Sequence, residues 1–202
     1  MSSVRRGSSD GPAPGSSDEA IEADPVDHAR SICLRQLTMG PRTRGQLETV
    51  LRRQGVDPDI AAVVLDRLVD VSLVDDAAFS QNYVRSRHSR RGLSRRAIGQ
   101  ELRGRGVTDE IVAEALEGLD PDDEIATAHA LVARRMSATR TLEVQVRTRR
   151  LVGMLARKGY PGGLSMRVVR EALLAERELD ELETRFLEGL DVELSDAARL
   201  GE

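Results

Sequence analysis

The sequence predicts an all-α protein built of three tandem three-helix repeats, each helix-turn-helix-like, that form an elongated curved stack. Three observations predict this fold. Similar segments recur after 51 and then 53 residues, apolar residues within each segment follow helical spacing, and no segment shows the two-residue alternation of a β-strand. A period near 50 residues is typical of stacked supersecondary units that share a continuous core.

The repeat is clearest in three segments that begin at Thr43, Ser94 and Arg147. The coinciding positions are Leu47, Ile98 and Leu151; Leu51, Leu102 and Leu155; Gly55, Gly106 and Gly159; Val56, Val107 and Tyr160; and Ile60, Ile111 and Leu164. Each segment reads as a helix, a turn and a second helix. The glycine stands where the end of a helix needs a left-handed residue.

A further helix is expected before each pair, over about 26–37, 76–89 and 121–136. Helix-start signals support these assignments, because short polar side chains accept hydrogen bonds from free N–H groups of the first turn. The signals are a capping box of Thr43 with Gln46, Asp57 and Asp120 each before a proline, Thr108, and one of Asp75 and Asp76. Phe79 and Tyr83 are four residues apart and are expected to stack against the core.

These elements divide the chain into five parts. Residues 1–24 are rich in Ser, Gly, Pro and Asp, and we expect them to be disordered. The three repeats are expected over 25–74, 75–120 and 121–175. The acidic segment 176–202 is either a continuation of the last helix to about Leu190 or a loose amphipathic tail, and the apolar spacing fits both.

Charge is distributed unevenly along the chain. The net charge of -4 is the sum of -3 over residues 1–24, +6 over 25–175 and -7 over 176–202. Nearly all the basic residues are arginines, whose planar guanidinium groups bind phosphates and carboxylates with two hydrogen bonds at once. A basic middle with acidic ends is typical of a protein that meets a polyanion or an acidic partner surface.

The sequence offers no constellation for catalysis, so we expect a protein that is not an enzyme and needs no cofactor or metal. The three histidines lack metal-ligand spacing, and Cys33 has the spacing of a small buried apolar residue. The glycine-rich stretch 159–163 lacks the Lys-Ser/Thr ending of a phosphate-binding loop. No apolar run approaches the roughly 20 residues of a membrane span, and no signal peptide is apparent, so we expect a cytoplasmic protein.

Two groups of basic residues are the candidate partner-binding or DNA-binding sites. They are Arg85, Arg87, Arg90, Arg91, Arg95 and Arg96 in the second repeat, and Arg147, Arg149, Arg150, Arg157 and Lys158 in the third. Further arginines lie just before the third repeat's group, at Arg134, Arg135 and Arg140, and a thinner set lies in the first repeat, at Arg42, Arg44, Arg52 and Arg53. Because the repeats stack, these groups are expected to line one side of the stack as a positive stripe. The alternative is a solvated face with each arginine paired to a nearby acid. The first group favours binding, since few acids lie near it in the sequence.

The second repeat carries a motif that resembles the RecX family. The matching residues are Leu73, Val74, Asp75, Asp76, Phe79, Tyr83, Val84, Arg87, Gly92, Ile98, Glu101, Leu102, Gly106 and Val107. The resemblance covers about residues 26–175. It implies three three-helix repeats, a cytoplasmic location, binding to the RecA recombinase and inhibition of its recombinase, ATPase and coprotease functions. Family members often have Lys where this chain has Arg105, so the charge is kept.

Three functional hypotheses follow. In the first, a monomer lies in the groove of a RecA–single-stranded-DNA filament, touches more than one RecA subunit and makes weak direct contact with DNA. In the second, the chain is a stand-alone helix-turn-helix-like DNA-binding protein. In the third, it is a helical scaffold that docks a different partner through the acidic helix at 176–190.

Overall fold

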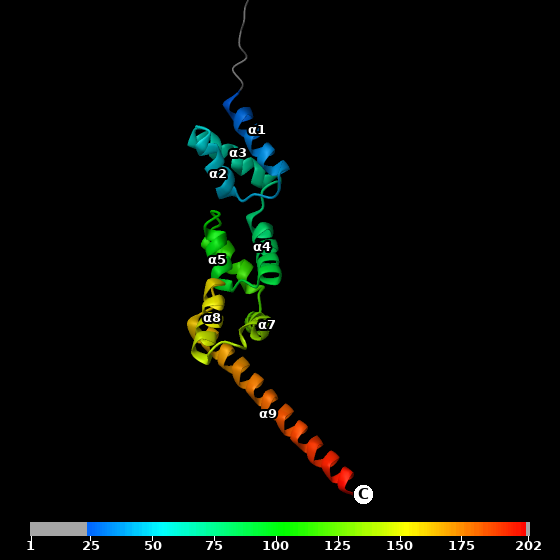
Figure 1. Cartoon of the computed structure of the whole chain (residues 1–202). Coiled ribbons are helices and arrows are strands. Elements are labelled where there is room, and N and C mark those ends of the chain that lie inside the picture. The colour runs from blue at the N-terminus through cyan, green and yellow to red at the C-terminus, as the bar shows by residue number, and fades with distance from the viewer. Residues whose placement is uncertain (1–23, 201–202) are drawn as a thin grey trace, which may run out of the picture.

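The computed structural model describes residues 24–200, with side chains described for 24–188. Within this range the protein is entirely helical (Figure 1). The helices are α1 (Pro25–Thr38), α2 (Arg44–Arg53), α3 (Pro58–Asp70), α4 (Asp76–Arg91), α5 (Arg95–Arg103), α6 (Asp109–Glu117), α7 (Pro121–Thr139), α8 (Val144–Arg157) and α9 (Gly162–Leu200). The all-α prediction is confirmed. The predicted disorder of 1–24 concerns residues that, apart from Asp24, lie outside the described range.

Successive groups of three helices form three units that follow one another in an elongated arrangement (Figure 1). Each unit has its own apolar core, drawn from its three helices. In the first unit Leu47 and Leu51 of α2 are fully buried, and in the second Ile98 and Leu102 of α5 hold the same positions. A core confined to each unit is the expected organisation of a repeat protein, in which stability comes from single units and from the interfaces between neighbours.

The local signals for helix starts operate as the sequence predicts, with one exception. Thr43 and Gln46 form a reciprocal capping box, while Asp57, Asp75 and Asp120 each accept first-turn N–H groups of α3, α4 and α7. Thr108 occupies the cap position of α6 with extended backbone, but its hydroxyl makes no capping hydrogen bond. The start of α6 therefore depends on packing rather than on a side-chain cap.

The repeated glycines have the left-handed backbone that the sequence predicts. Their φ angles are 75° at Gly55, 78° at Gly106 and 89° at Gly159. Two of them also permit close packing between units. A Cβ atom at Gly106 would lie 2.8 Å from the Cα of Gly45, and one at Gly159 would lie 2.6 Å from the Cβ of Ala97. Glycine is therefore required at these two positions for the backbone angle and for the approach of the neighbouring unit.

The first and second units meet where α2 begins, at a contact that we call the first joint. The hydroxyl of Thr43 donates to the carbonyl of Arg105, in the turn after α5, at 2.6 Å. The N–H of Arg44 donates to a carboxylate oxygen of Asp76, at the start of α4, at 2.9 Å. The start of one unit's middle helix thus binds the next unit at two points, and the carboxylate suits the positive end of a helix dipole.

The second and third units meet at the equivalent positions of the repeat, which we call the second joint. The N–H of Ser94 donates to the carbonyl of Lys158 at 3.0 Å, and the N–H of Arg95 donates to Glu124 in the first turn of α7 at 3.0 Å. Ser94 lies 51 residues after Thr43 and Lys158 lies 53 residues after Arg105, which is the spacing of the sequence repeat. The stacking contact is therefore repeated together with the fold.

The acidic segment forms part of the last helix as far as the structure describes it. α9 continues as a helix to Leu200 and extends away from the third unit (Figure 1). Beyond that unit its apolar positions have no core to face, so Leu179, Leu182 and Phe186 are 57–67% exposed. The side chains after residue 188 lie outside the described part of the chain.

Candidate partner-binding site

Basic side chains from three helices surround a depression at the second joint, which we call the second joint pocket. Its volume is about 610 Å³. Five cationic side chains line it: Arg90 and Arg91 at the end of α4, Arg134 on α7, and Arg157 and Lys158 at the end of α8. The pocket therefore joins members of the two basic groups that the sequence keeps about 60 residues apart.

The helix ends explain how these cations come together. α4 stops at Gly92, which is left-handed with a φ of 59°, and α8 stops at the turn before Gly159. Because carbonyl groups at a helix C-terminus carry partial negative charge, basic residues are favoured in the last turn. Lys158 uses this directly, since its Nζ donates to the carbonyl of Arg91. Arg90 and Arg91 lie in the last turn of α4 and Arg157 lies in the last turn of α8, so Arg134 on α7 is the one cation of this pocket that the helix ends do not explain.

Hydrogen bonds within the second unit and between the second and third units lie beside the pocket. The two ring nitrogens of His88 lie 3.0 Å from the carbonyl of Leu93 and 2.9 Å from the hydroxyl of Thr127. The buried hydroxyl of Tyr160 donates to the carbonyl of Gly92 at 3.2 Å. Burial, and then the negative charge of Glu124, raise the pKa of Tyr160 to about 12, so this donor stays protonated.

The electrostatic character of the pocket is uniformly positive. None of the lining residues that the structure describes is acidic. Arg90, Arg91 and Arg157 are exposed, and no described acid forms an ion pair with them. Guanidinium groups in this state can bind phosphate or carboxylate oxygens without first breaking an internal ion pair.

Three other candidate residues are engaged within the protein. Arg87 pairs with Glu101 at 3.2 Å, and its guanidinium lies 4.6 Å from the ring centroid of Tyr83. The guanidinium of Arg95 donates to the carbonyl of Leu119 at 2.9 Å. These contacts fix the second unit internally, and Tyr83 in turn stacks on Phe79 with ring centroids 5.7 Å apart.

The third, Arg147, is buried to 6% exposure. Its guanidinium forms a two-pronged ion pair with Glu176 of α9 and donates to the hydroxyl of Thr139 at 3.1 Å and to the carbonyl of Met136 at 3.0 Å. Every arm of this side chain is used inside the third unit. In this structure Arg147 serves the fold rather than the surface.

The remaining candidates, Arg85, Arg96, Arg149 and Arg150, are exposed and lie outside the pocket. Arg134 lines the pocket but is absent from the candidate groups. The sequence shows it with Arg135 and Arg140 just before the second group, but a single sequence does not reveal that it meets residues of α4 and α8.

Other chemistry finds little support among the described residues. No group of three or more His, Cys, Asp or Glu side chains is arranged to hold a metal ion there. Cys33 is fully buried, and burial raises the pKa of its thiol, which disfavours the reactive thiolate. Within residues 24–200, no helix combines the length and the apolar character needed to cross a membrane.

Comparison with known proteins identifies the three units individually. Family models for the first, second and third three-helix domains of RecX match residues 29–68, 75–116 and 122–169. A regulatory protein RecX from Thermobifida fusca is 52% identical over 83% of this chain and 89% of its own length. A regulatory protein RecX from Streptomyces coelicolor is 51% identical over 77% of this chain and 82% of its own length.

A solved structure supports the fold. The crystal structure of RecX from Lactobacillus salivarius superposes with a TM-score of 0.67, covers 75% of this chain and 99% of its own, and is 20% identical in sequence.

Proposed function

Since the chain belongs to the RecX family of regulatory proteins, we propose that it binds RecA or the RecA–DNA filament and restrains recombinase, ATPase and coprotease activity. The observation that carries the proposal is the second joint pocket, where cations from α4, α7 and α8 converge without a lining acid. Such a surface complements a partner that presents carboxylates, phosphates or both.

The elongated stack supplies the second argument. Three units in a row present their surfaces over a greater length than one compact domain does (Figure 1). A regulator of this shape, acting as a monomer in the cytoplasm, can contact more than one subunit of a repeating filament. Contacts to two subunits act together, because the second forms at high effective concentration once the first is made.

The mechanism needs binding energy alone. Arg90, Arg91 and Arg157 grip anionic groups of the filament, and the helices beneath hold these side chains in place. An elongated stack bound across neighbouring subunits stabilises one relative arrangement of them. Any filament step that changes this arrangement is then disfavoured by the difference in affinity between the two states.

The direct test is a RecA ATPase and strand-exchange assay with single-stranded DNA. Full-length protein at micromolar concentration is expected to inhibit both reactions. The double variant Arg90→Glu/Arg91→Glu is expected to lose most of the inhibition. Arg30→Glu/Arg35→Glu is the matched control, because it makes the same charge change at exposed positions of the first unit outside the pocket.

Two results would contradict the proposal. Wild-type protein that leaves both reactions unchanged rules out the regulatory role. Equal loss of inhibition in the two double variants shows that overall charge, and not the second joint pocket, controls binding. Pull-down of RecA with and without single-stranded DNA then distinguishes binding to the subunit from binding to the filament.

A further inference from the structure

The outer half of α9 carries an apolar stripe that no described part of the chain covers. Leu179, Leu182 and Phe186 follow one another at steps of three and four residues, so they lie on one side of the helix, and they are 57–67% exposed. The stripe continues the line of Val168 and Ala172, which belong to the core of the third unit. Beyond that unit the same side of the helix faces solvent.

Acidic side chains border this stripe. Glu178 and Glu183 flank it, are exposed, and form no ion pair with a described base. Residues 176–188 include six acids and two arginines. Pairing between two such helices is disfavoured, because a parallel coiled coil would set Glu178 of one helix against Glu183 of the other. The stripe therefore fits an apolar surface that has a basic rim.

The second joint pocket combines these two properties. Leu93, Leu131 and Met154 line it and are half-buried, so they present apolar surface to the pocket. Its five cationic side chains surround them without a described acid. An amphipathic helix with acidic borders is the complement of such a surface, since its apolar side can enter the groove while its carboxylates meet the rim.

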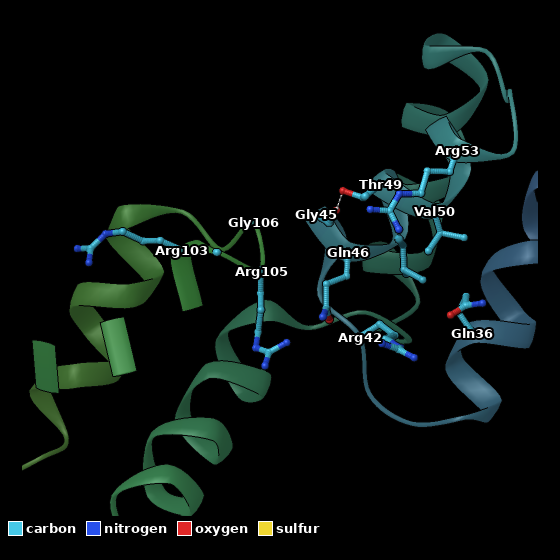
Figure 2. A pocket seen from close by; sticks show the side chains of 12 residues that line it. Gln36, Arg42, Gly45, Gln46, Thr49, Val50, Arg53, Arg103, Arg105 and Gly106 are labelled. Carbon is cyan, nitrogen blue, oxygen red and sulfur yellow. Dashed lines mark hydrogen bonds between the residues drawn. The ribbon is translucent and has the colours of Figure 1, made fainter. Parts of the chain in front are cut away.

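The depression at the first joint does not offer the same match. Its lining includes Arg42, Arg53 and Arg105, which Figure 2 shows, together with polar side chains and glycines. Among the described lining residues Val50 and Leu47 are the apolar ones, and Leu47 is fully buried. Apolar content, and not charge alone, therefore distinguishes the second joint pocket as the surface that suits the stripe.

The outer half of α9 cannot reach the pocket of its own chain. α9 is one continuous helix that leaves the third unit (Figure 1). At a rise of about 1.5 Å per residue, Leu182 lies roughly 30 Å along the helix axis from Gly162, where α9 begins. The helix that fits the pocket must therefore come from another molecule.

We propose that α9 of one molecule docks into the second joint pocket of a second copy of this chain. The stripe packs against the apolar side chains of the pocket, while Glu178 and Glu183 pair with its arginines. Charge complementarity of this kind fixes the partner and its orientation. The inference goes beyond the proposed function, because it concerns the protein without RecA. Docking covers the pocket, so the monomer is the form that binds the filament.

Sedimentation velocity of the full-length protein, without RecA and from low to high micromolar concentration, tests the proposal. Wild type is expected to sediment faster as its concentration rises. The stripe variant Leu182→Gln/Phe186→Gln keeps charge and helix propensity, and the pocket variant Arg90→Glu/Arg91→Glu reverses two rim charges. Each variant alone is expected to lose the concentration dependence.

An equimolar mixture of the two variants is expected to regain association, because the stripe variant keeps the pocket and the pocket variant keeps α9. Arg42→Glu/Arg53→Glu is the matched control, since it makes the same charge change at the first joint. It is expected to associate like wild type. Circular dichroism verifies that each variant is folded.

Wild type that stays monomeric at every concentration overturns the inference, as does a mixture that stays monomeric. Association of the pocket variant at the wild-type level assigns the stripe to another surface, and equal loss in the control assigns the effect to overall charge. A stripe variant that no longer inhibits RecA also overturns it, because the stripe then contacts the filament. Loss of self-association with inhibition of RecA intact leaves the proposed function standing.

Discussion

One position of the repeat has two different roles. At the two joints it contacts the next unit, and at the outer end of the third unit its side chain is buried inside the unit. Thr43 and Ser94 begin α2 and α5, and each binds the turn of the next unit. Their counterpart Arg147 lies inside α8, which starts one turn earlier, at Val144, with Glu143 as its cap. There the side chain turns inward and pairs with Glu176 of α9.

The difference shows how a repeat protein ends. An internal unit leaves the start of its middle helix open for a neighbour, whereas the last unit lengthens that helix and ties it to α9. Terminal repeats generally need such modification, because their outer face has no further unit to cover it. The first unit ends differently. Gly55 holds the repeat position at which Gly106 and Gly159 contact the preceding unit, and nothing lies within 4 Å of where a Cβ atom at Gly55 would stand.

The largest expected effect comes from a substitution that creates a clash between the first and second units at the first joint. Gly106→Ala places a Cβ atom 2.8 Å from the Cα of Gly45 and adds strain at a φ of 78°. We expect a loss of roughly 4 kcal/mol in the free energy of unfolding, from left-handed strain of about 1–2 kcal/mol and overpacking of about 1–3 kcal/mol. Gly55→Ala has the same backbone strain without the contact, so urea denaturation of both variants isolates the joint. Equal losses would contradict the role of Gly106 in stacking.

The next effect tests the ion pair between Arg147 of α8 and Glu176 of α9. Arg147→Ala leaves Glu176 without its partner in a mostly buried site, and we expect a loss of about 3 kcal/mol in the free energy of unfolding. Arg149→Ala, two residues along the same helix and exposed, is expected to change stability by less than about 0.5 kcal/mol. If urea denaturation gives similar values for the two, the ion pair does not hold α9 to the third unit.

A smaller effect distinguishes the hydrogen bonds that the two joints use. Thr43→Ala removes both a helix cap and the hydroxyl that binds Arg105, so we expect a loss of about 2 kcal/mol. Ser94→Ala removes only the cap, because its joint contact is made by the backbone N–H, and the expected loss is about 1 kcal/mol. Chemical denaturation that ranks Ser94→Ala as the costlier change would reverse this distinction.

The smallest effect is a pH dependence at the first joint. Burial raises the pKa of Asp76, although the hydrogen bond from the Arg44 N–H and the charge of Arg44 oppose the shift. Because the folded state favours the protonated form, this contribution to stability is present below the ordinary pKa of about 4. It is lost as pH rises through the raised pKa.

The comparison is with Asp76→Asn, which keeps an oxygen acceptor for the Arg44 N–H but cannot ionise. Urea denaturation at several pH values is expected to show wild type losing stability relative to this variant across that window, and a constant difference above it. Two parallel curves would mean that Asp76 is not desolvated in the folded protein.

Sequence reasoning reached the fold more completely than the site. The coinciding apolar positions Leu47, Ile98 and Leu151 predicted the repeat, because the hydrophobic periodicity of a helix can be recognised from residues close together in the sequence. The arginine clusters predicted binding from charge density alone. That criterion did not distinguish Arg90, which is free at the surface, from Arg147, whose charge is consumed inside the third unit.

The sequence by itself determined what depends on neighbours along the chain: the helix starts at Thr43 and Asp57, the left-handed glycines, and the apolar face of each helix. Tertiary structure alone decided which cations meet. Arg91 and Lys158 are 67 residues apart and adjoin at one joint, and Arg42 and Arg105 line one pocket. The physical reason is that helix formation and capping act within a few residues, whereas a binding surface depends on contacts that form only when the units stack.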